Sequence, residues 1–80
     1  MARLLFLGRL EDLAGAGERE WALAEPTPLV DVLLMLPPAL AEALREPKVR
    51  VAGNGMLVEA AGLIVAADDE VAFLPPVSGG

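Results

Sequence analysis

The chain has 80 residues, of which 12 are acidic and 6 basic, and these give a net charge of −6 at pH 7 with no His and no Cys. This length predicts one small domain, and the missing residue types exclude a Ser-His-Asp triad, a thiolate nucleophile, a disulfide and a zinc site of the usual ligands. The acidic balance and the scattered basic residues argue against nucleic acid and membrane as partners, because both are bound through clustered Lys and Arg.

The first third of the chain predicts a hairpin. Residues 3–8 form a short apolar run, which is typical of a strand buried on both faces. One helical turn is expected at 10–13, followed by a glycine-containing loop at 14–17. Residues 19–24 then alternate charged or small residues with larger apolar ones, which is the period of a half-buried strand.

A helix is expected next, with Thr27 as its cap and Pro28 as its first helical residue. Four aliphatic residues repeat at i, i+3, i+4 and i+7 and therefore share one face. They are Leu29, Val32, Leu33 and Leu36. Val30, Leu34 and Met35 make other sides of this helix apolar as well. Either the helix is buried more widely than usual, or these three residues belong to a partner surface.

A second short helix is expected to start at Pro38 and to end before Pro47. Residues 48–52 alternate again and predict a strand. Asn54-Gly55 is a strong hairpin signal, because both residue types tolerate left-handed backbone angles. The returning strand is expected at 56–58.

The pattern does not determine the structure of 59–67, whereas 71–74 predicts a final strand that Pro75 ends. The resulting order of strands and helices predicts an α+β fold with the helices on one face of the sheet. If the first and last strands are neighbours, Phe6 and Phe73 can both reach the core.

Two further segments could carry chemistry, but a structural interpretation is favoured for both. The acidic run Asp68-Asp69-Glu70 could hold a divalent cation, yet three consecutive side chains do not converge on one ion, so a solvated turn is favoured. Gly53-Asn54-Gly55 could cradle a phosphate, but no glycine-rich phosphate motif precedes a helix here. We therefore expect no metal site and no bound cofactor.

The end of the chain is the strongest candidate site. Pro75 and Pro76 restrict two successive φ angles and favour an extended exit from the last strand. We predict a domain at 1–75 and a flexible Gly-Gly arm at 76–80, which can extend about 16 Å at roughly 3.3 Å per residue. Such an arm suits a terminal carboxylate that enters another protein's pocket.

The last two residues fit that use. Gly80 has no Cβ to crowd its carbonyl carbon when a nucleophile attacks, and Gly79 lets the backbone thread a narrow channel. Because a carboxylate is a poor electrophile, a partner would first have to activate it, for example as an acyl-adenylate. The residues therefore predict a carrier of a chemical group.

Residues 71–80, with the sequence VAFLPPVSGG, resemble the closing motif of the small subunit of molybdopterin synthase, one of the ubiquitin-like β-grasp sulfur carriers. Asp69-Glu70 also matches, and weaker likeness extends to Leu5-Phe6-Leu7, the turn at 10–13 and Asn54. The sequence departs from the family where Leu74 replaces a second aromatic residue and Gly53 a bulky apolar one. The resemblance implies a β-grasp fold: a mixed sheet of about five strands, helices packed on one face, and an extended C-terminal tail.

The resemblance also implies a function. An E1-like activating enzyme would adenylate Gly80 with ATP, and a sulfurtransferase would convert it to a thiocarboxylate that donates sulfur to precursor Z in molybdenum cofactor biosynthesis. Ser78 and Gly79 would line the insertion channel of the large synthase subunit. In this family the catalytic side chains belong to that subunit, so the chain is not expected to be catalytic alone.

Strand alternation adds a prediction about the partner surface. If Phe73 points inward, Leu74 points outward, and Leu57 alternates in the same way on its own strand. An exposed apolar patch would mark an interface. The predicted interface residues are Leu57, Leu74, Pro75, Pro76 and Val77. The acidic surface as a whole is expected to complement basic rims on the activating enzyme and the synthase.

Other functions remain open. One is a sulfur carrier for thiamine synthesis or tRNA thiolation, and another is a ubiquitin-like protein modifier. A plain ubiquitin-like binding module is a further alternative, whereas no base, nucleophile or metal cluster supports a free-standing enzyme. The first apolar run is too short for a signal peptide and the run at 29–36 too short for a membrane span, so a soluble cytoplasmic domain is expected.

Overall fold

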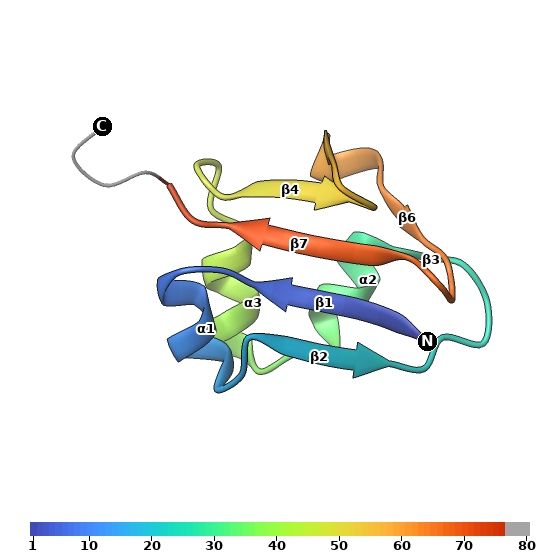
Figure 1. Ribbon diagram of the computed structural model, residues 1–80, viewed down its shortest axis with the longest axis horizontal. Helices are drawn as coiled ribbons and strands as arrows, with labels where there is room; N and C mark the ends of the chain where they lie inside the picture. The colour runs from blue at the N-terminus through green and yellow to red at the C-terminus, as the bar shows by residue number, and fades with distance from the viewer. Residues whose placement is uncertain (77–80) are drawn as a thin grey trace.

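The computed structural model describes residues 1–76 of the chain. A mixed five-stranded sheet with the order β2-β1-β7-β4-β5 forms its framework (Figure 1). The first and last strands, β1 and β7, are parallel neighbours, and the other neighbours are antiparallel. The strands are β1 (Ala2–Phe6), β2 (Glu18–Trp21), β4 (Arg50–Gly53), β5 (Met56–Val58) and β7 (Glu70–Leu74).

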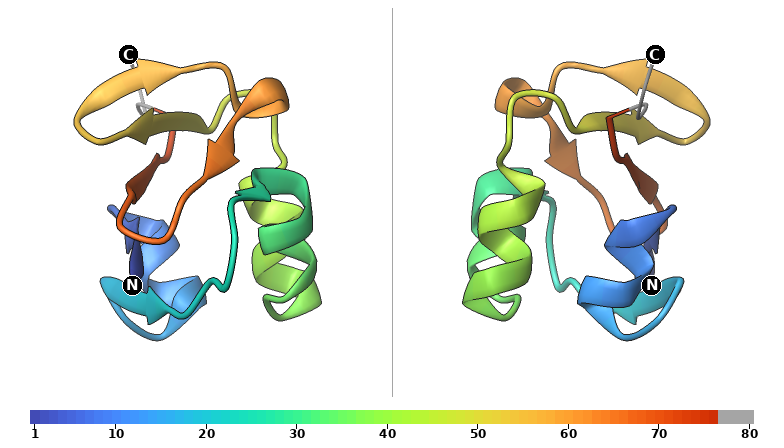
Figure 2. Two further views of the ribbon diagram at one scale, coloured as in Figure 1. Left: turned by 90° about the vertical axis from the view of Figure 1, so that its right-hand side faces the viewer. Right: turned by 90° about the vertical axis from the view of Figure 1, so that its left-hand side faces the viewer.

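Helices α2 and α3 lie against one face of this sheet, and α1 follows β1 at its end (Figure 2). This is the α+β, β-grasp arrangement predicted from the sequence. Within residues 1–76 no helix is long and apolar enough to cross a membrane. The helices are α1 (Arg9–Ala14), α2 (Leu29–Leu34), α3 (Pro38–Leu44) and the 3₁₀ turn η1 (Ala60–Gly62), and a separate two-stranded sheet pairs β3 (Thr27–Pro28) with β6 (Ile64–Val65).

The core lies between the helices and the inner face of the sheet. Alternate residues of β1 and β7 point toward the helices, and Phe6 is paired directly with Phe73. Their rings are stacked with centroids 5.6 Å apart and 10° between the planes. Such a pair contributes about 1 kcal/mol beyond the burial of its area. The predicted meeting of these two side chains in the core is confirmed.

The prediction that the first strand is buried on both faces is wrong. Arg3 is exposed and Leu5 half-buried, because the helices cover only the opposite face of β1. The second strand is also shorter than expected. It ends at Trp21, and Leu23 packs against the core from outside the strand.

The predicted aliphatic stripe is buried as expected, with Leu29, Val32 and Leu33 on α2, whereas Leu36 is buried beyond the end of that helix. The interpretation of a more widely buried helix is wrong: Val30, Leu34 and Met35 are 55, 68 and 50 % exposed. Their alternative role in a partner surface remains a prediction.

The predicted start of that helix is also wrong. The Thr27 hydroxyl donates to the Glu25 carbonyl at 2.9 Å and makes no cap, and Pro28 is extended with φ −58° and ψ 141°. Thr27 and Pro28 pair instead with Val65 and Ile64. This long-range pairing keeps both residues in strand conformation, so α2 begins only at Leu29.

The hairpin at Asn54-Gly55 is confirmed by positive φ angles of 50° and 86°. The turn also fixes the start of β7. The Asn54 backbone N–H donates to the Glu70 carbonyl at 2.7 Å, and the Glu70 N–H donates to Asn54 Oδ1 at 2.8 Å. Because the Asn54 N–H is bound inside the protein, it does not serve a phosphate.

The acidic run forms a turn whose three carboxylates have different partners. Asp68 lies 3.3 Å from the N-terminal ammonium group, and Glu70 pairs with Arg3. Asp69 accepts hydrogen bonds from the Ala66 N–H at 2.9 Å and from Asn54 Nδ2 at 3.0 Å. These two hydrogen bonds stabilise the ionised carboxylate and hold the pKa of Asp69 below its usual value, and the bond from Ala66 has the larger effect. Among the described residues, no three acidic side chains gather where a metal ion could bind.

Candidate functional site

The candidate site begins where β7 ends. β7 lies in the middle of the sheet (Figure 1). Its last residue, Leu74, is paired with Arg50 of β4. On the other side the Leu7 N–H donates to the Phe73 carbonyl at 3.2 Å. Pro75 and Pro76 then lack the N–H groups that further ladder bonds would need. The chain therefore leaves the sheet from a strand that is held on both sides up to the prolines.

Gly8 fits against the first of these prolines. Its φ of +56° is one that side chains rarely adopt, and a Cβ at Gly8 would lie only 2.9 Å from Pro75 Cγ. Sequence reasoning did not single out Gly8 for this role, because only the parallel pairing of β1 and β7 brings it beside Pro75. This contact sets where the tail leaves the domain.

The face of the sheet opposite the helices carries an apolar row. Leu5, Ala72, Ala52 and Leu57 are successive ladder partners on β1, β7, β4 and β5. Leu57 is 62 % exposed. Leu74 is two residues beyond Ala72 and therefore shares this face, but it is half-buried and separated from Leu57 by β4. Alternation within each strand predicted Leu57 and Leu74 as members of this surface. It does not show which residues of different strands lie side by side, so Leu5, Ala52 and Ala72 were not predicted.

Charged side chains border the row on the side of Arg3. The Arg3 guanidinium forms ion pairs with Glu70 and, at 3.5 Å, with Glu18. The hydrogen bond to Glu70 is the main cause that raises the pKa of Arg3, and the charges of both carboxylates add to it. Exposed pairs of this kind contribute little stability. Their effect is to limit the apolar surface to the half of the sheet nearer the tail.

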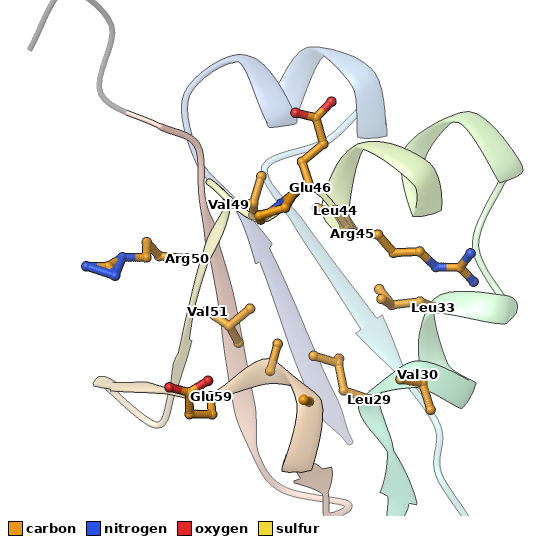
Figure 3. Close-up of a pocket in the computed structure, with 13 residues that line it drawn as sticks. Leu29, Val30, Leu33, Leu44, Arg45, Glu46, Val49, Arg50, Val51 and Glu59 are labelled. Carbon is orange, nitrogen blue, oxygen red and sulfur yellow. The ribbon is translucent and has the colours of Figure 1, made fainter.

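A cleft of about 350 Å³ lies between the helices and β4 (Figure 3). Its walls are mainly aliphatic and include Leu29, Leu33, Leu44, Val49 and Val51. Four charged residues also line it, namely Arg45, Glu46, Arg50 and Glu59, and Figure 3 shows their charged ends lying apart from one another. A catalytic pocket needs convergent polar groups, and this cleft does not present them.

The predicted site residues are thus only partly described. Leu57 and Leu74 lie on the uncovered face, and Pro75 and Pro76 are half-buried at the end of the sheet. The other four predicted residues, Val77, Ser78, Gly79 and Gly80, lie outside the described residues.

The parallel pairing of the first and last strands, with helices on one face, defines a ubiquitin-like β-grasp protein. The ThiS family matches residues 4–80, and the chain belongs to this family. It has the fold shared by ThiS-like sulfur carriers and ubiquitin-like modifiers. No match was found among curated protein sequences.

Solved structures similar to this chain include two archaeal modifier proteins. SAMP1 from Haloferax volcanii has 27 % identity and a TM-score of 0.78, with 99 % of this chain and 98 % of that chain covered. Small archaeal modifier protein 1 from Methanosarcina acetivorans has 27 % identity and a TM-score of 0.75, with 99 % and 95 % covered. A Pyrococcus furiosus protein provisionally named molybdopterin converting factor, subunit 1, has 24 % identity and a TM-score of 0.73, with 95 % and 97 % covered, which supports the fold alone.

Proposed function

We propose that this chain is the sulfur-carrying small subunit of a molybdopterin synthase. An activating enzyme joins the Gly80 carboxylate to the α-phosphate of ATP, and pyrophosphate leaves. A sulfur nucleophile supplied by a sulfurtransferase then displaces AMP and yields a thiocarboxylate. In the large synthase subunit this sulfur passes to precursor Z during molybdenum cofactor biosynthesis.

One observation supports the proposal above all others. The closing sequence 71–80 starts on the central strand of a β-grasp sheet and continues through Pro75, which contacts Gly8. A tail that leaves a rigid sheet at a defined point can be presented to a partner's channel with little loss of entropy at its base. Membership of the ThiS family is consistent with this use of the C-terminus.

The apolar row is the proposed contact surface for the large subunit. Leu57 offers an exposed side chain, and Leu74 adjoins Pro75 at the start of the tail. Apolar area next to the tail would hold the two subunits together while the tail occupies the channel. Val77, Ser78 and Gly79 would then lie inside that channel.

A second candidate is a ubiquitin-like protein modifier. It is favoured by the two modifier proteins that share 27 % identity and nearly the full length of this chain. In that case a target amine, instead of sulfur, would displace AMP from activated Gly80. Sulfur carriers for thiamine synthesis or tRNA thiolation would share the activation step and differ in the sulfur acceptor.

Removal of Gly79 and Gly80 tests the proposal. The wild-type chain and the shortened chain are each combined with activating enzyme, ATP, a sulfur source and large subunit, and conversion of precursor Z is measured. We expect conversion with the wild type only, while both chains bind the large subunit. Equal conversion by the shortened chain would refute the carrier role, and a wild-type chain that is activated without converting precursor Z would favour the alternatives.

A further inference from the structure

Three basic side chains surround the point where the tail leaves the sheet. Lys48 and Arg50 line one pocket together with Pro75 and Pro76, and Arg9 lines another that also reaches Pro76. All three are exposed. We call Arg9, Lys48 and Arg50 the basic collar.

The basic collar is opposite in charge to the rest of the protein. Glu46 is the one acidic residue that lines either of these pockets among residues 1–76. The remainder of the chain carries eleven acidic side chains and three basic ones. Charges are screened over about 8 Å at physiological salt. A partner bound at the tail therefore interacts electrostatically with the nearby collar more strongly than with the distant charges that make up the net charge of −6.

The collar is also available to a partner. The ion pairs within residues 1–76 involve Met1 and Arg3 as cations and none of the collar residues. Figure 3 shows Arg50 extending away from the cleft and from Arg45. On the uncovered face Arg50 is the ladder partner of Leu74, so the collar adjoins the apolar row.

From this placement we infer that the basic collar docks on an acidic rim around the site where the activating enzyme receives the tail. A polyanion such as nucleic acid is a poor fit, because three cations face eleven anions elsewhere on a small domain. A local acidic protein surface fits both the few cations and the adjoining prolines and Leu74. This inference rests on the proposed function, which supplies the activating enzyme as the partner. It predicts an acidic rim on that enzyme, in place of the basic rim expected from the net charge.

The test compares Arg50→Glu with Arg45→Glu. Both arginines are exposed, and both substitutions change the net charge equally, but Arg45 follows α3 and extends away from Arg50 and from the end of β7 (Figure 3). The rate of pyrophosphate release by the activating enzyme is measured under kcat/KM conditions at low and high ionic strength, and Lys48→Glu serves as an independent collar variant. Thermal midpoints of all variants are measured to confirm folding.

We expect both collar variants to lower kcat/KM about five- to tenfold at low ionic strength, with a smaller effect at high ionic strength. Arg45→Glu should stay within about twofold of the wild type. Equal effects of Arg50→Glu and Arg45→Glu, or a faster reaction of the collar variants, would overturn the collar while leaving the proposed function intact. Failure of the wild type to be adenylated would contradict the proposed function itself, and with it the partner assigned to the collar.

Discussion

Replacement of Gly8 by alanine tests how the tail is positioned. The new Cβ would lie 2.9 Å from Pro75 Cγ, whereas carbon atoms in ordinary contact are at least about 3.5 Å apart. The proline ring would therefore have to move by about 0.6 Å or more. Since the ring is rigid and continues the central strand, such a shift would displace the start of the tail.

The backbone angle at Gly8 adds to this effect. A residue with a side chain at φ +56° and ψ −136° carries about 1–3 kcal/mol of strain. Together with the contact to Pro75, we expect a loss of roughly 2–3 kcal/mol in unfolding free energy, which lowers the thermal midpoint by about 10 °C or more in a domain of this size.

Two other glycines provide matched controls. Gly15 is in the left-handed region, with φ 78° and ψ 5°, and has nothing within 4 Å of its Cβ position, so Gly15→Ala measures the cost of a positive φ without a steric contact. Gly62 has neither a positive φ nor a neighbour within 4 Å, so its substitution should be nearly neutral. Chemical denaturation of the three variants gives the free energies. A Gly8→Ala variant no less stable than Gly15→Ala would refute the role of the Pro75 contact.

The remaining predictions concern the apolar row, the acidic run 68–70 and the C-terminal residue Gly80. Leu57→Asp should weaken binding of the large subunit roughly tenfold, whereas Ile64→Asp, which is similarly exposed on β6, should not; equal binding by both variants would argue against the apolar row. The lowered pKa of Asp69 means that its carboxylate stabilises the fold above the unfolded value of about 3.9, and that this contribution disappears as the pH falls through the lower folded value. The unfolding free energy of the wild type should thus fall more steeply below about pH 4 than that of Asp69→Asn, and parallel curves would contradict the hydrogen bonds to Asp69 as the cause. Gly80→Ala should slow sulfur transfer because its methyl group crowds the reacting carbonyl, and its thermal midpoint, measured alongside, separates this effect from misfolding; transfer at the wild-type rate would count against Gly80 as the sulfur-bearing residue.

The elements that the sequence predicted correctly depend on local patterns. The Asn54-Gly55 turn follows from two residues that accept positive φ, and the buried stripe on α2 follows from helical spacing. The meeting of Phe6 with Phe73 was expected only on the assumption that the first and last strands are neighbours, and the structure shows that they are.

The features that were missed depend on contacts between distant segments. Thr27 and Pro28 carry an ordinary helix-start signal, but their pairing with β6 overrides it. The contact between Gly8 and Pro75 and the row through Ala52 and Ala72 also require the strand order. The basic collar was hidden for the same reason, because Arg9 is far from Lys48 and Arg50 in sequence and the total charge is acidic.

The intact mass of the wild-type chain after incubation with ATP, a sulfur source and the activating enzyme tests the central proposal most directly. The proposal predicts a mass increase that corresponds to exchange of one oxygen for one sulfur, located by fragmentation at Gly80. An unchanged mass, or sulfur found at any other residue, would contradict it.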